Sequence, residues 1–141
     1  MKIGILEILT FPFNSSYELL FSALVMRQYS SIMPQTVSYW CRQLGHEVYY
    51  KTYWGLGDPT KQLPKDLDFV FVSCPTHLSH LAYIVAKFYQ GKAITVLGGP
   101  HAKCYPEDAL RFFDFVVKRC DKIIIKSLLN KEYSKGLTID T

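Results

Sequence analysis

Short runs of apolar residues alternate along this chain with segments of helical periodicity. The runs KIGILEI, LDFVFVS and AITVL are almost continuously apolar, which is typical of strands buried on both faces of a parallel sheet. The segments between them repeat apolar residues at helical spacing, on one face. The expected strands cover residues 2–8, 46–53, 67–73, 93–97 and 114–118, and the expected helices cover 34–44, 79–90, 106–113 and 121–131.

This alternation predicts an α/β fold: a Rossmann or flavodoxin-like three-layer sandwich around a five-stranded, mainly parallel sheet. Five strands favour the order 2-1-3-4-5, in which a ligand binds beyond the carboxyl ends of strands one, three and four. We expect the domain to span residues 1–131, with 132–141 as a tail or the start of a linker. Residues 17–29 are apolar enough for a further helix, as a flap over the crevice or an extra packing helix.

The composition and charge of the chain indicate a globular protein and argue against several other classes. The chain has 141 residues, of which 49% are hydrophobic and 20% charged, as in an ordinary globular domain. The net charge of +4 is modest and its basic residues are scattered, which argues against nucleic-acid binding. The start lacks the order of a secretory signal, and no run of about 18 apolar residues predicts a membrane span. Four isolated cysteines indicate reduced thiols and a cytoplasmic protein.

Two loops follow expected strands and carry candidate binding residues. Hydroxyl groups and backbone N–H groups after the strand 67–73 suit an anion or an amide-rich ligand, although Thr76 or Ser79 also suits a helix cap. The glycines after the strand 93–97 permit a sharp turn and the close approach of another group, or mark only a tight strand exit. The candidates are Ser73, Cys74, Thr76, His77, Gly98, Gly99, Pro100 and His101.

Other chemistries have weaker support in the sequence. Cys74 with His77 and His101 with Cys104 are pairs three residues apart, and nitrogen and sulfur ligands of this kind suit a soft metal ion. No G-x-G-x-x-G motif follows the first strand and no P-loop occurs, which argues against nucleotide chemistry. No nucleophile-elbow motif is present, so free-standing hydrolysis is not expected.

Three segments of the chain resemble, in their order and spacing, the N-terminal cobalamin-binding domain of B12-dependent radical SAM enzymes. They are LGHEVYYKTY, DFVFVSCPTHLSHLAYIVAKF and ITVLGGPHAKCYPEDALRFFDFVVK. The likeness covers roughly residues 34–120. It implies a Rossmann-like domain that holds cobalamin at the carboxyl edge of its sheet. Ser73 and Thr76 would then contact the nucleotide tail or the corrin amides, Gly98 and Gly99 would admit the tail, and His101 would shape the adjacent loop.

The D-x-H-x-x-G motif, which supplies an axial histidine in the cobalamin domains of mutases and methionine synthase, is absent, so cobalamin would bind without that ligand. The chain departs from the pattern of the resembled family in two places. Residues 118–121, KRCD, replace the usual G-E-G-E. No C-x-x-x-C-x-x-C motif occurs, so an iron–sulfur cluster and S-adenosylmethionine are expected only with a following domain or a partner chain, and this chain alone is not expected to be catalytic. The alternatives are a standalone regulatory or interaction domain that kept the fold and lost the cofactor, and a small metal-binding protein that uses its Cys and His residues.

Overall fold

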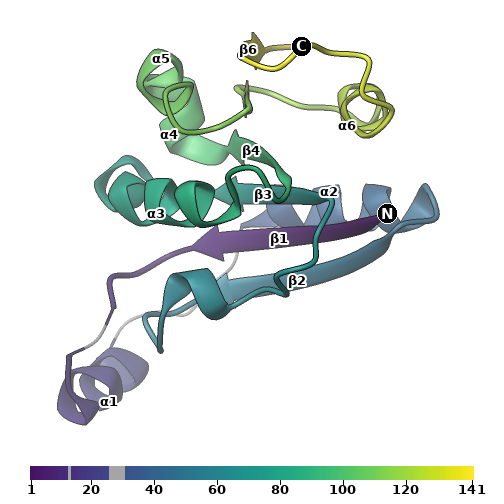
Figure 1. Cartoon of the computed structure of the whole chain (residues 1–141). Helices are drawn as coiled ribbons and strands as arrows, with labels where there is room; N and C mark the ends of the chain where they lie inside the picture. The colour runs from purple at the N-terminus through teal and green to yellow at the C-terminus, as the bar shows by residue number, and fades with distance from the viewer. Residues whose placement is uncertain (13, 26–30) are drawn as a thin grey trace.

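A computed structural model describes residues 1–12, 14–25 and 31–141 of the chain. Its centre is one parallel sheet of six strands in the order β2-β1-β3-β4-β5-β6, with β2 at the bottom and β6 at the top of Figure 1. The predicted Rossmann or flavodoxin-like α/β fold and the order 2-1-3-4-5 are confirmed. The strands are β1 Lys2–Ile8, β2 Glu47–Tyr53, β3 Phe69–Ser73, β4 Ile94–Gly98, β5 Phe115–Val117 and β6 Leu137–Ile139.

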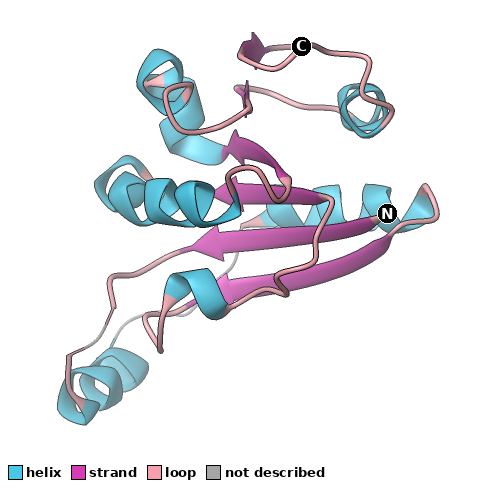
Figure 2. Ribbon diagram, in the orientation of Figure 1, coloured by secondary structure: helices cyan, strands magenta, loops and turns pink. Residues whose placement is uncertain are grey.

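Helices cover both faces of this sheet and complete three layers (Figure 2). One core lies between the sheet and α3, and it includes Val72 and Leu97; the other lies between the sheet and α2 with α6, and it includes Phe71 and Val96. Successive strand residues point to opposite faces, which explains why neighbours in sequence belong to different cores. The helices are α1 Ser16–Val25, α2 Ile32–Gln43, α3 Ser79–Tyr89, α4 Gly99–Cys104, α5 Pro106–Ala109 and α6 Lys122–Leu129.

The sheet has one strand more than expected. Residues 132–141, expected to form a tail or the start of a linker, contain β6, which pairs in parallel with β5. The backbone N–H of Lys118 donates to the carbonyl of Ile139 at 2.9 Å, and the Ile139 side chain is buried. The segment therefore adds the edge strand of the sheet beside β5.

Two further segments differ from their expected form. Residues 99–104, expected as a turn, form the short helix α4, with Pro100 in its first turn, where its missing N–H costs no hydrogen bond. The helix expected over 17–29 is described as α1 for residues 16–25, and residues 26–29 lie outside the described part. Tyr17 and Leu24 in α1 are each 77% exposed, and α1 extends away from the sheet (Figure 1).

The contribution of β6 to stability can be measured with one substitution. We expect Ile139→Ala to lower the free energy of unfolding by about 2 kcal/mol, because it removes a buried side chain from the core on the α6 face. Leu137→Ala is the matched control, since Leu137 lies in the same strand and is 41% exposed. Equal effects of the two changes in urea unfolding would show that β6 is not packed as described.

Candidate functional site

Three strands end in register at the carboxyl edge of the sheet. Glu7 of β1 lies beside Ser73 of β3, and Ser73 lies beside Gly98 of β4. All three residues occupy alternate positions with Ile5, Phe71 and Val96, so they face the α2 and α6 side of the sheet. The predicted meeting of these strand ends at one edge is confirmed.

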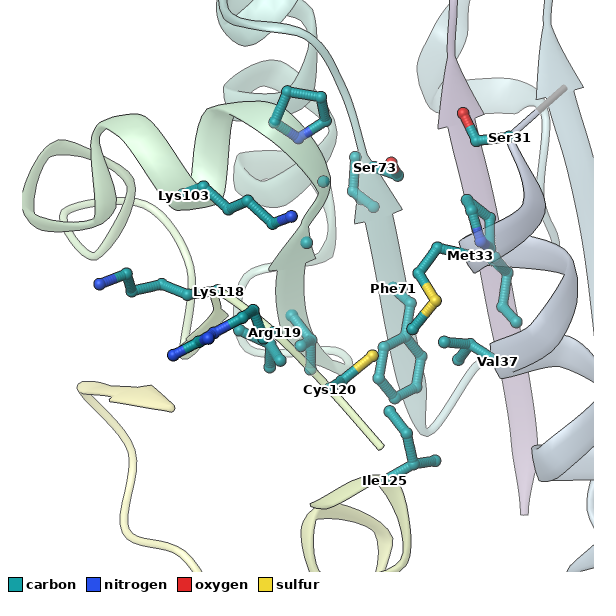
Figure 3. A pocket seen from close by; sticks show the side chains of 18 of the residues that line it. Ser31, Met33, Val37, Phe71, Ser73, Lys103, Lys118, Arg119, Cys120 and Ile125 are labelled. Atoms are coloured by element: carbon teal, nitrogen blue, oxygen red, sulfur yellow. The ribbon is translucent and has the colours of Figure 1, made fainter. Parts of the chain in front are cut away.

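A pocket of about 630 Å³ opens at this edge, between the sheet and the helices α2, α4 and α6. Its volume falls in the range of roughly 300–1,000 Å³ that is common for small-molecule and cofactor sites. Figure 3 shows Met33, Phe71, Cys120 and Ile125 pointing toward one another around the pocket. Its floor consists of Ile5, Val37, Phe71, Val96, Val117 and Ile125.

Positive charge gathers at the mouth of the pocket, formed by α4 and the loop 118–120. Lys103, Lys118 and Arg119 all belong to its lining, whereas none of its described lining residues is acidic. Arg119 Nε lies 2.7 Å from Asp140 Oδ1, and Lys118 Nζ lies 3.7 Å from Asp140 Oδ2. The Arg119 hydrogen bond and charge hold the pKa of the Asp140 carboxyl below its usual value. Asp140 therefore remains charged and offsets part of this positive charge.

The wall formed by α2 is held by a buried carboxylate. Glu7 is 1% exposed, and it accepts hydrogen bonds from the Ser31 backbone N–H at 2.7 Å and from the Tyr50 hydroxyl at 2.9 Å. Ser31 immediately precedes α2 and lines the pocket. Because these hydrogen bonds engage both carboxylate oxygens, Glu7 fixes the start of α2.

The two glycines at the mouth differ in their geometry. Gly99 has φ +84°, and a Cβ atom there would lie 2.6 Å from the Ser73 hydroxyl oxygen. Gly98 has an extended backbone with φ −127°, and a Cβ atom there would meet nothing within 4 Å. Gly99 is thus required for the close approach of β3 and α4, whereas Gly98 leaves space in the pocket mouth.

Four of the eight predicted site residues line the pocket: Ser73, Gly98, Gly99 and Pro100. Cys74 lies instead in the core on the α3 face and is 1% exposed. Burial raises the pKa of its thiol to about 12, so this thiol stays protonated near neutral pH. Its carbonyl accepts from the His101 backbone N–H at 3.2 Å, which joins the two predicted loops.

Thr76, His77 and His101 lie beside the pocket but are not part of its lining. Thr76 and His77 form a 3-10 turn, Thr76–Leu78, before α3. The His77 ring lies 5.8 Å from the Phe11 ring, centroid to centroid. Phe11 comes from the segment after β1, so this segment also lies at the edge where the two predicted loops meet.

His101 is 3% exposed and faces α3. Its Nε2 lies 2.6 Å from the Tyr83 hydroxyl, which donates to Asp108 Oδ2 at 2.6 Å. Because the hydroxyl proton goes to Asp108, His101 donates from Nε2, and its buried Nδ1 has no partner among the described residues. Burial lowers the pKa of His101, and the charge of Asp108 opposes that shift. His101 therefore joins α3, α4 and α5 as a neutral side chain.

The metal site considered from the sequence finds no support. Within residues 1–12, 14–25 and 31–141, no three His, Cys, Asp or Glu side chains are grouped so that they could hold a metal ion. Of the four proposed ligands, Cys74 and His101 are buried on the α3 face, while Cys104 is exposed and lines the pocket mouth.

Several pocket residues were not selected from the sequence as site residues. The apolar floor follows from alternation along the strands, but the same residues also suit an ordinary core. Lys118, Arg119 and Cys120 were noted only as a departure from a family pattern, and they reach the pocket because α6 packs against α2. Lys103 carried no sequence signal, because its position depends on α4 being a helix.

No protein-family model, no curated protein and no solved structure matches this chain. Among the helices that the structure describes, none is long and apolar enough to cross a membrane.

The two glycines give a paired stability test. We expect Gly99→Ala to lower the free energy of unfolding by about 2 kcal/mol or more, because a side chain at positive φ is strained and the new Cβ would overlap the Ser73 hydroxyl. Gly98→Ala should change it by no more than about 0.5 kcal/mol, since its Cβ enters open space. Thermal or urea unfolding measures both. Similar losses in the two variants would contradict the described geometry of the mouth.

Proposed function

We propose that this chain binds a cofactor of the cobalamin type in the pocket at the carboxyl edge of its sheet. The observation that carries the proposal is the pocket itself: about 630 Å³ of apolar space beneath the ends of β1, β3 and β4, with Gly98 and Gly99 at its mouth. This is the place at which an open parallel sheet binds its ligand. The resemblance of residues 34–120 to cobalamin-binding domains supports the choice of ligand.

The pocket residues suit the parts of such a cofactor. An aromatic base at the end of the nucleotide tail would be buried among Phe71, Val96 and Ile125, which favour apolar surface. Gly98 leaves room for the tail to enter. Ser73 is only half-buried at the mouth, where its hydroxyl could bond to an amide side chain of the corrin ring.

The lining also bears on how the cobalt would be ligated. No histidine is among the described residues that line the pocket, and no D-x-H-x-x-G motif occurs in the chain. The proposed cofactor would therefore be held through its tail and ring amides, without an axial histidine from this pocket. When bound, such a cofactor supplies a cobalt centre for methyl transfer or related radical chemistry, in which a separate or following domain would act on the substrate.

Titration with hydroxocobalamin tests the proposal. We expect the purified protein to change the visible spectrum of the cofactor and to retain it through desalting. Gly98→Leu should weaken binding by at least about tenfold, because its side chain would occupy the mouth while its backbone remains unstrained. Gly98→Ala is the matched control and should retain most of the affinity.

Thermal unfolding of both variants must show that each is folded as the wild type is. A folded wild-type protein that neither shifts the spectrum nor retains hydroxocobalamin would refute the proposed function. Binding that is equal in the wild type and in Gly98→Leu would refute the proposed site. If the folded wild-type protein does not bind hydroxocobalamin, the alternative is favoured: an interaction domain that kept the fold and lost the cofactor.

A further inference from the structure

We propose that the pocket selects an amphipathic anion: a flat or chain-like apolar body, buried on the floor, that carries a negative group at the mouth where Lys103 binds it. The inference concerns the charge class of the ligand, which the likeness to known domains does not supply. That the anion belongs to a cobalamin-type cofactor rests on the proposed function. That the ligand is an anion rests on the pocket residues alone.

The pocket has two parts, an apolar floor and a charged mouth. Every residue of the floor is aliphatic or aromatic: Ile5, Val37, Phe71, Val96, Val117 and Ile125. A polar group buried there would lose its hydrogen bonds to water without replacement, at a cost of roughly 1–3 kcal/mol. The floor therefore selects an apolar body, and any charge on the ligand must lie at the mouth.

The mouth of the pocket carries positive charge. Lys103, Lys118 and Arg119 carry three positive charges, and the only acid that pairs with any of them among the described residues is Asp140. Lys118 and Arg119 extend away from Phe71, while the Lys103 side chain extends from α4 toward the space beside Ser73 (Figure 3). Lys103 forms no ion pair with any described residue, so its ammonium group is available to a ligand.

The positive charge of Lys103 acts on a residue inside the pocket. Burial and the charge of Asp121 raise the pKa of the Cys120 thiol, and the charge of Lys103 acts in the opposite direction. Cys120 lies on the pocket lining (Figure 3). The positive charge of Lys103 therefore acts across the pocket on Cys120, above the apolar floor.

A cobalamin-type cofactor carries both parts of this ligand class in its nucleotide tail, not in the molecule as a whole. Its nucleotide tail carries one phosphodiester group between the aromatic base and the corrin ring, so a base on the floor would place the anion nearer the mouth. A carboxylate or a sulfonate on an aromatic body has the same two parts. The shared chemistry, one anion on a compact apolar body, is what the pocket is inferred to recognise.

A matched pair of fluorescent probes separates the contribution of the apolar floor to binding from that of the Lys103 charge. 8-Anilinonaphthalene-1-sulfonate has an apolar aromatic body and one negative charge, and N-phenyl-1-naphthylamine has the same body without the charge. Both are titrated into the full chain, and into Gly98→Leu, which fills the pocket mouth. Fluorescence that survives in Gly98→Leu comes from other apolar surface, such as α1, and is subtracted.

We expect the pocket-specific binding of the sulfonate to weaken about three- to tenfold in Lys103→Gln, because a charge-assisted contact is lost, and to weaken with added salt. Lys87→Gln is the matched control, since Lys87 is an exposed lysine on α3, which covers the opposite face of the sheet. Binding of the uncharged probe should be the same in the wild type and in both lysine variants.

The outcomes test two claims separately: that the pocket selects an anion, and that this anion is part of a cobalamin-type cofactor. If Lys103→Gln binds the sulfonate as the wild type does, if the uncharged probe binds as tightly as the sulfonate, or if no signal depends on Gly98, the inference is wrong. Displacement of the sulfonate by hydroxocobalamin supports the proposed function together with the inference. Lys103-dependent binding that hydroxocobalamin does not displace would retain the charge class and reject the cobalamin proposal.

Discussion

The parallel register of β1, β3 and β4 is the constraint on which the rest of the site depends. Parallel pairing requires each strand to return through a crossover, so the carboxyl ends of all three meet at one edge. The register places Glu7, Ser73 and Gly98 in a row across the sheet. Glu7 then holds the start of α2, and Gly99 allows α4 to begin directly against Ser73. The pocket lies between these two fixed helix starts.

Alternation of side chains divides the loops at this edge between two faces. Ser73 and Gly98 face α2 and α6 and so line the pocket, whereas Cys74 belongs to the α3 face. His101 is bound to Tyr83 on that second face and connects α4 to α3. Residues close together in the sequence, and equally suggestive of a site, therefore divide into binding and structural roles.

The sequence was sufficient for most of the fold. Five strands were predicted from short apolar or aromatic runs that alternate with helical patterns, and three of these runs are almost continuously apolar. The sixth strand was missed because LTI is only three residues long and lies in a polar segment, with only Ile139 buried. Helix α4 was read as a turn because GGPHAK begins with two glycines, although a proline in the first helical turn is a known signal.

For the site, the strand ends were predictable and the opposite wall was not. Ser73 and Gly98 end buried strands and Gly99 and Pro100 follow directly, so their place at the edge follows from the fold class. Lys103 and the loop 118–120 reach the pocket through the rotation of α4 and the packing of α6, which are tertiary features. The sequence showed only that KRCD departs from a pattern; the structure places three of these four residues on the pocket.

Backbone amide NMR of the isotope-labelled chain, recorded during addition of hydroxocobalamin, tests the central claim most directly, because each residue reports separately. We expect the amide signals of Ser73, Gly98, Gly99 and Lys103 to shift or broaden in proportion to bound cofactor. Signals from the centre of α3, on the opposite face of the sheet, should stay unchanged. Changes confined to α3 or β2, or no changes at saturating cofactor, would contradict a cofactor site at this edge.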